Sequence, residues 1–297
     1  MTPRLSVLIP FYRDDPSVLL RSLDRQGVNP GDVEILVMDD GTDDPALSRT
    51  VDATVAAMRR PCRHIRAECN RGRSATRNAL QAQARADWVL FLDADMRVDQ
   101  TDFLNRYLEG IETGECDIIF GGFAVEPRAE DPDTDLHRAL SHVSDCLSAE
   151  HRRQNPAKHV ASSNLCVRKA LLDAEPFDPA FTGWGWEDSE WAARVAERYR
   201  LHHIDNPAVH LGLETTESLL SRFAASGENY RRFVLAHPAL ARTLPLYRIV
   251  NRLKAVPGHA LARSPLRAMV RTHALPVGLR VAALKMWRAS HYAEAMK

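Results

Sequence analysis

The sequence of 297 residues lacks the features of a membrane-spanning or disulfide-stabilised protein. No segment approaches the roughly 18 consecutive apolar residues that a transmembrane helix needs. The apolar part of segment 1–15 is too short for a cleavable signal peptide and better fits a β-strand. The five cysteines form no CxxC pair and no metal-finger spacing, which is typical of reduced thiols. We therefore expect a cytoplasmic protein.

The chain also lacks net charge, but its charges are unevenly distributed. Basic and acidic residues number 39 each. Residues 242–297 hold eleven of the basic residues and a single acid, Glu294, which leaves 28 basic and 38 acidic residues in 1–241. Such asymmetry favours an anionic surface as the partner of the basic segment.

Short apolar runs alternate with helical patterns over the first hundred residues. The expected strands are 5–9, 33–38, 63–67 and 88–92, and helices are expected near 16–23, 45–59 and 73–85. This alternation predicts an α/β fold with a mostly parallel central sheet flanked by helices. Ligands of such sheets bind beyond the carboxyl ends of the strands.

The second half has a more mixed pattern. Its expected strands are 117–120, 160–167, 201–204 and 208–211, and its expected helices lie near 136–147 and 187–199. A composition shift near residue 240 divides the chain into a main domain, 1–240, and a basic amphipathic helical extension, 241–297.

Acidic residues follow two of the expected strands. Asp39 and Asp40 end the second strand, and Asp93 and Asp95 follow the fourth. Side chains two residues apart in an extended segment point the same way. Hard oxygen ligands of this kind suit Mn²⁺ or Mg²⁺ on a diphosphate, whereas a solvated turn is the alternative explanation.

Four segments in this order, SVLIPFYRDD, VMDDGTDD, NRGRSATRNAL and WVLFLDADM, resemble the family 2 glycosyltransferases with the GT-A fold, a Rossmann-like fold. The resemblance covers residues 5 to about 212 and implies a nucleotide-sugar donor, with UDP as the expected nucleotide and Asp40 accepting a hydrogen bond from the uracil or other base. Its implied donor-binding residues are Pro10, Tyr12, Asp40, Asn70 and Asp93. It further implies that Asp95 is a metal ligand.

The segment GWGWEDSEW, 183–191, resembles the GWGxED segment of a subgroup that includes chondroitin-polymerase-type and β-1,4-galactosyltransferase-type enzymes. The resemblance implies that Asp188 is the general base and that Trp184, Gly185 and Glu187 contact the acceptor or the sugar. A purely structural alternative makes the two acids partners of the positive end of a helix. Trp191 falls inside the expected helix, so we expect it in the core.

His210 ends the expected strand 208–211. A single histidine more often has a structural role than a ligand role. In this fold, however, a histidine after the base motif commonly completes the metal site, so the resemblance implies that His210 is a second metal ligand. Arg71, Arg73 and Arg77 are either a solvated basic face or a charge balance for a diphosphate.

Residues 242–297 combine apolar and basic positions at roughly helical spacing, divided by Pro257, Pro265 and Pro276. Basic amphipathic helices can lie on an anionic membrane. The alternative is a set of helices packed on the core with basic outer faces. Binding to nucleic acid is disfavoured because no binding motif accompanies the charge.

The resemblance implies a metal-dependent inverting glycosyltransferase that moves a sugar to a hydroxyl of a glycan acceptor, in bacterial polysaccharide or glycolipid synthesis. The acceptor could be lipid-linked if the basic segment binds membrane. A sugar nucleotidyltransferase is one alternative, but PFYRDDPS is not a triphosphate loop rich in glycine and lysine. A non-catalytic sugar-nucleotide-binding protein is the other.

Overall fold

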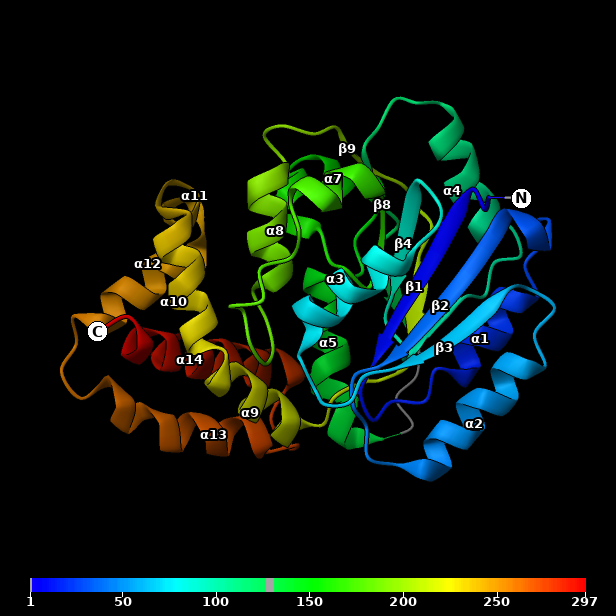
Figure 1. Ribbon diagram of the computed structural model, residues 1–297. Coiled ribbons are helices and arrows are strands. Elements are labelled where there is room, and N and C mark those ends of the chain that lie inside the picture. The colour runs from blue at the N-terminus through cyan, green and yellow to red at the C-terminus, as the bar shows by residue number, and fades with distance from the viewer. Residues whose placement is uncertain (1, 127–130) are drawn as a thin grey trace.

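The computed structural model describes residues 2–126 and 131–297 and contains a central sheet of seven strands (Figure 1). In sheet order the strands are β3 (Cys62–Arg66), β2 (Val33–Asp39), β1 (Leu5–Phe11), β4 (Trp88–Leu92), β8 (Asn164–Arg168), β6 (Ile118–Phe120) and β9 (Leu201–His203). The first four strands are parallel, whereas β8 runs antiparallel to both β4 and β6. The predicted α/β architecture is confirmed.

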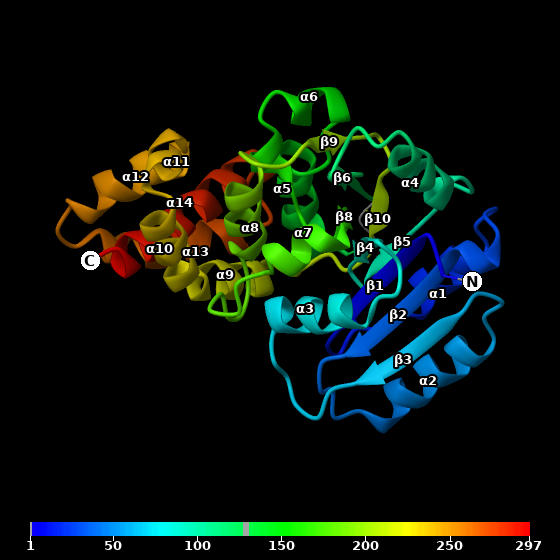
Figure 2. The same cartoon turned by 45° about the horizontal axis from the view of Figure 1, so that its top comes forward.

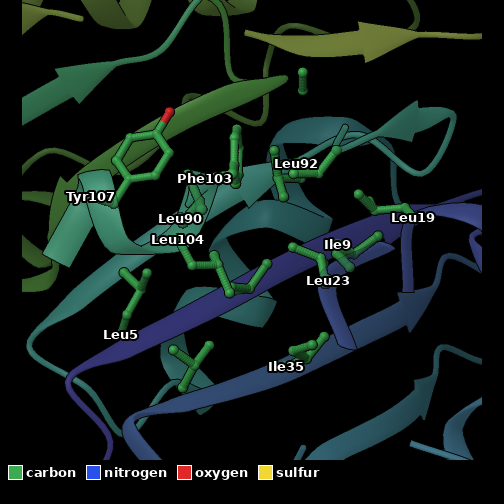
Figure 3. Close-up of a cluster of buried hydrophobic side chains, with 14 of the residues drawn as sticks. Leu5, Ile9, Leu19, Leu23, Ile35, Leu90, Leu92, Phe103, Leu104 and Tyr107 are labelled. Atoms are coloured by element: carbon green, nitrogen blue, oxygen red, sulfur yellow. The ribbon is translucent and has the colours of Figure 1, made fainter. Parts of the chain in front are cut away.

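Helices cover both faces of this sheet. One face packs on α1 (Ser17–Asp24), α2 (Pro45–Ala56) and α4 (Phe103–Glu112). The other packs on α3 (Arg73–Gln83), α7 (Lys169–Ala174) and α8 (Glu187–Val195). Alternate residues of the strands point to opposite faces, so Leu5, Ile9 and Ile35 lie in the first core, which Figure 3 shows in close-up.

A second, smaller sheet lies beyond the end of β4. It has the order β5 (Met96–Arg97), β10 (Ala208–His210) and β7 (Phe123–Val125). Strand β10 runs antiparallel to β5, with His210 opposite Met96. This pairing brings His210, which lies late in the α/β region of the chain, next to the Asp93–Asp95 segment.

The C-terminal part of the chain is helical and packs around α14 (Val277–Ala295). Its other helices are α9 (Thr216–Ala225), α10 (Gly227–Ala236), α11 (Pro238–Thr243), α12 (Pro245–Lys254) and α13 (Arg263–Arg271). Helix α14 contacts α9, α10, α12 and α13, and it also contacts α5 (Asp135–Ser144) of the α/β region (Figure 2). Among the described residues, no helix is long and apolar enough to cross a membrane.

Several predicted boundaries differ from the observed ones. The expected strand 160–167 is observed as Asn164–Arg168, because residues 162 and 163 form a turn directly before it. The expected helix 187–199 ends at Val195. Helices α4, α9 and α10 and the short helix α6 (Ala149–Arg153) were not anticipated, nor were the 3₁₀ turns Pro30–Asp32, Pro132–Thr134 and His259–Ala262. The composition shift near residue 240 falls within α11.

Candidate active site

Two predicted donor-binding residues meet beyond the carboxyl end of β2. Asp40 is buried, and its two carboxylate oxygens accept backbone hydrogen bonds from Arg71 (3.0 Å) and Gly72 (2.9 Å). Asn70 precedes these residues in the same loop and is exposed. Gly41 has a left-handed backbone, and a Cβ there would lie within 2.6 Å of the Asn70 nitrogen, so the two loops are in direct contact.

The end of β1 supplies the other predicted residues on this side. Pro10 is half-buried within β1 and lies opposite Met38 of β2. Tyr12 follows the strand and is 37% exposed, with its ring beneath the guanidinium of Arg13 at 4.9 Å. Arg13 itself has a left-handed backbone and donates its N–H to the Thr42 hydroxyl. The exposed Tyr12 ring is therefore available for stacking on a planar group.

Asp95 and His210 lie in contact where β5 meets β10. The His210 Nε2 and Asp95 Oδ2 atoms are 3.0 Å apart. Burial alone would raise the pKa of Asp95, but the hydrogen bond and charge of His210 outweigh it and lower that pKa. The same contact outweighs the burial of His210 and raises its pKa. Both shifts favour the charged pair.

The described residues contain no group of three or more His, Cys, Asp or Glu side chains that could hold a metal ion. The pair Asp95–His210 nevertheless fits Mn²⁺ or Mg²⁺. Such ions are usually held by one or two protein ligands and completed by waters and substrate phosphates. A two-residue site is therefore sufficient for an ion that arrives with a diphosphate.

Glu187 and Asp188 open α8, and both lie within 4 Å of a side chain of α3. Glu187 is 4% exposed, whereas the Asp188 side chain is 24% exposed. The Asp188 Oδ2 atom accepts a hydrogen bond from the Ser162 backbone N–H at 3.0 Å. Burial first, and then the neighbouring Asp188 charge, raises the pKa of Glu187. Asp188 is thus the more accessible carboxylate of the pair.

A single buried arginine joins these acids to the Asp93–Asp95 segment. Arg77 of α3 is 2% exposed, and its guanidinium lies 3.5 Å from Asp93, 3.6 Å from Asp188 and 3.7 Å from Glu187. The attraction of these three carboxylates outweighs desolvation and raises the pKa of Arg77. The explanation of Arg77 as part of a solvated basic face is wrong, because the side chain points inward onto carboxylates.

The tryptophans near α8 have three different environments. Trp184 is half-buried and meets Phe223 of α9 edge-on, with ring centroids 5.3 Å apart. Trp186 packs on helices α10 and α14. Trp191 is fully buried, stacks on Phe177 and donates to a backbone carbonyl, which confirms the prediction that it belongs to the core. Gly185 has a left-handed backbone, with φ of 91°.

The sequence-based reasoning missed the contacts of Arg77 and Trp186. A signal for Arg77 was present, since it lies three residues before the buried Leu80 on the same face of α3. No local signal marked Trp186, whose partners lie 44 or more residues further along the chain. Likewise, no local signal in the sequence marked the Ser162 backbone N–H as the hydrogen-bond donor to Asp188.

Comparison with solved structures identifies the fold class of this chain. The chain has the GT-A fold, as shown by its similarity to a mannosyltransferase, PcManGT, from Pyrobaculum calidifontis, solved with GDP-Man and Mn²⁺. That comparison has a TM-score of 0.59 at 16% identity and covers 98% of this chain and 86% of the other. The crystal structure of S. aureus TarS 1–349 is also similar, with a TM-score of 0.55, 17% identity, and coverage of 99% and 90%.

The chain belongs to glycosyl transferase family 2. The profile of that family matches residues 6–174, which is more than half of the chain. The uncharacterized glycosyltransferase EpsJ of Bacillus subtilis (strain 168) is 31% identical over 125 residues. This alignment covers 41% of the present chain and 35% of EpsJ, so the chain matches about a third of that relative's length.

Proposed function

We propose that the protein transfers a sugar from a nucleoside diphosphate donor, with UDP as the expected nucleotide, to a hydroxyl of a glycan acceptor with inversion. The observation that carries this proposal is the position of Arg77. It places Asp93, on the donor side, and Asp188, the proposed base, within 3.6 Å of one guanidinium. Donor and base would thus share one site, as a direct displacement requires.

The donor is proposed to lie along the ends of β1, β2 and β4. Tyr12 and Pro10 would contact the base, which Asp40 would recognise with oxygen lone pairs left free by its backbone bonds. Asn70 and Asp93 would lie near the ribose. PcManGT was solved with GDP-Man and Mn²⁺, and TarS 1–349 with UDP-GlcNAc, which supports a nucleotide sugar as the donor class.

Asp95 and His210 are proposed to hold Mn²⁺ or Mg²⁺ together with the donor diphosphate. The ion would stabilise the negative charge that develops on the leaving nucleoside diphosphate. The Asp95 carboxylate and the His210 ring nitrogen lie 3.0 Å apart, and His210 would bind the ion as a neutral imidazole. No further protein ligand is needed if the diphosphate supplies oxygens.

Asp188 is proposed to act as the general base. It would accept the proton of the acceptor hydroxyl as that oxygen attacks the anomeric carbon, while the bond from the anomeric carbon to the diphosphate oxygen breaks. The Ser162 N–H binds Oδ2, and Oδ1 is buried beside Arg77, so Oδ2 of the 24% exposed side chain is the oxygen that would take the proton. Glu187 and Gly185 would border the acceptor, and Trp184 would present an aromatic face to a sugar.

The test is transfer and donor hydrolysis measured with a panel of UDP- and GDP-sugars in the presence of Mn²⁺. The variant Asp188→Asn should bind the donor normally and lose at least about 100-fold in kcat, which is the lower range for a general base. Glu197→Gln, an exposed acid just after α8, is the matched control and should retain full activity. Normal transfer by Asp188→Asn would exclude Asp188 as the base.

We also propose that the protein attaches to an anionic membrane surface through residues 242–297 and there meets a lipid-linked acceptor, in bacterial polysaccharide or glycolipid synthesis. Support comes from the arginines and lysine of α12. Within residues 2–126 and 131–297, none of Arg248, Arg252 and Lys254 forms an ion pair, and all three are exposed. Exposed apolar residues, Ile249, Val256 and Leu261, lie on the same stretch.

A further inference from the structure

Trp186 has a backbone conformation that a tryptophan rarely adopts. Its φ is 76° and its ψ is −12°, in the left-handed region. Among the described non-glycine residues, only Arg13 shares a positive φ. A side chain with a Cβ is strained there, and such strain persists only when the surroundings impose it. The identity of these surroundings therefore matters.

Trp186 is the N-terminal capping residue of α8. It directly precedes Glu187 and Asp188, and its carbonyl oxygen accepts the hydrogen bond of the Glu190 N–H, at 2.9 Å. This is the first turn of α8. The left-handed residue therefore sets the direction in which α8 starts, and with it the position of both carboxylates beside Arg77.

The side chain of Trp186 is held by three aromatic residues of the C-terminal helices, which we name the aromatic clamp: Tyr230 and Phe233 of α10 and Tyr292 of α14. The ring centroids lie 5.0, 4.9 and 6.1 Å from that of Trp186. Each clamp residue is at most 2% exposed. Figures 1 and 2 both place α10 and α14 beside the start of α8.

Hydrogen bonds fix the orientation of the clamp. The Trp186 Nε1–H donates to the Tyr292 hydroxyl at 3.1 Å, and that hydroxyl lies 2.7 Å from the Ser226 hydroxyl. Asn229 of α10 donates to the carbonyl oxygens of Thr182 and Gly185, both at 2.9 Å. The helical unit therefore holds the loop both by its backbone and by its indole ring.

We infer that Trp186 is a positioning residue for Asp188, and that the aromatic clamp of α10 and α14 keeps the base in its catalytic place. This inference rests on the proposed function for its catalytic consequence. It assigns the C-terminal helices a part in catalysis that is separate from membrane attachment. Trp186 touches no reacting atom and acts through the geometry of α8.

Two variants of the clamp form a matched pair. Tyr292→Phe keeps the stacked ring but removes the hydroxyl that Trp186 bonds. Tyr230→Phe removes a hydroxyl from the adjacent stacked ring, and the structure shows no partner for that hydroxyl among the described residues. Both variants lose one oxygen from the same aromatic group, so a difference between them reports on the hydrogen bonds of the Tyr292 hydroxyl, to Trp186 and to Ser226.

The first experiment is amide hydrogen exchange of the full-length protein, read on peptides that cover 182–190. Tyr292→Phe should exchange about three to ten times faster there, as expected for loss of one hydrogen bond. Tyr230→Phe should match the wild type. Equal protection in both variants would overturn the inference, and this readout needs no substrate.

The second experiment measures kcat and the donor KM with whichever UDP- or GDP-sugar of the panel the wild type uses. Tyr292→Phe and Trp186→Phe should each lower kcat about three- to tenfold with an unchanged donor KM. The double variant should lose no more than either single one, because both remove the same bond. An additive loss, or an equal loss in Tyr230→Phe, would contradict the inference.

Trp186→Gly tests the role of the ring separately from the backbone strain, because glycine adopts a positive φ without strain. The variant should fold but lose the anchor of the loop, so its kcat should fall more than tenfold. Full activity would mean that the ring is not needed to place Asp188. If the wild type uses no nucleotide sugar, the proposed function fails, and hydrogen exchange alone decides whether the clamp holds the loop.

Discussion

The positive charge of Arg77 offsets the repulsion among the three carboxylates beside it. Glu187 is buried next to Asp188, and two carboxylates so close repel each other. A buried ion pair gains little net stability, but removing one partner leaves an uncompensated buried charge. The guanidinium suits this position because it can face several carboxylates with its forked N–H groups.

Replacement of Arg77 should therefore destabilise the whole protein. We expect Arg77→Met to lower the free energy of unfolding by about 3–5 kcal/mol, the usual cost of breaking a buried pair. Arg73→Met is the matched control, because Arg73 is 42% exposed and lies 3.8 Å from Glu187. It should cost less than about 1 kcal/mol. Urea unfolding measures both, and equal effects would show that Arg77 does not balance the buried acids.

At the scale of elements, the small sheet β5–β10–β7 decides where the proposed metal ligands lie. Pairing of β10 with β5 places His210 opposite Met96, the residue after Asp95. The backbone N–H of Leu211 also donates to the Asp95 carbonyl at 2.9 Å. The next residue, Gly212, packs so closely that an added Cβ would lie 2.1 Å from the Asp95 carboxylate. Only glycine leaves that carboxylate in place.

Gly212→Ala should accordingly disturb the proposed metal site without removing a ligand. The methyl group would displace the Asp95 carboxylate, and we expect Mn²⁺-dependent affinity for UDP to fall about tenfold, at the lower end of effects seen near metal ligands. Gly278→Ala in α14 is the control, because an added Cβ there meets no atom within 4 Å. Calorimetric titration with and without Mn²⁺ measures the change. Unaltered affinity in Gly212→Ala would remove Asp95 from the metal site.

At the scale of the whole molecule, the basic C-terminal segment divides into packed and exposed parts. Helices α13 and α14 pack on the rest of the protein, and Arg280 is buried with two hydrogen bonds to Asp135. Arg267 and Arg271 both pair with Glu217. The explanation of packed helices with basic outer faces thus applies to this part. Helix α12 differs, since Arg248, Arg252 and Lys254 are exposed and the helix lies at the end of the molecule away from the central sheet (Figure 1).

Charge reversal on α12 is the test of membrane attachment. Each basic residue near an anionic surface contributes about 1 kcal/mol, so Arg248→Glu, Arg252→Glu and Lys254→Glu together should weaken binding to phosphatidylserine vesicles on the order of 100-fold. Flotation of the full-length protein measures it. Reversal of Arg21, Arg25 and Arg49, which are exposed on or beside α1 and α2, changes the net charge equally and should have little effect. Equal flotation of both triple variants would contradict the proposal.

Truncation at residue 241 would be a poor test of membrane attachment, because it would also disrupt the fold. Val250, Ala289 and Tyr292 are buried in one core cluster with Phe181 and Tyr230, so removing them would expose apolar surface. It would also remove Tyr292 from the aromatic clamp. The division of the chain at 240 remains a prediction from composition, whereas the helices on both sides of it share a core.

The sequence by itself determined the α/β alternation, the strands β1, β2 and β4, the acids beyond their ends and the burial of Trp191. Such features depend on local periodicity and on residues next to one another, which a sequence displays directly. It also carried the resemblance that placed the base motif at the start of α8.

Only the tertiary structure decided that β8 runs antiparallel, that Arg77 joins Asp93 to Asp188, and that Tyr292 holds Trp186. The residues in these contacts are separated by 16 to 111 positions along the chain. Their pairing depends on how helices and strands pack. The spacing of apolar residues along a helix predicts which face is buried, but it does not predict which residues contact that face. The tertiary fold therefore determines which residues these side chains contact.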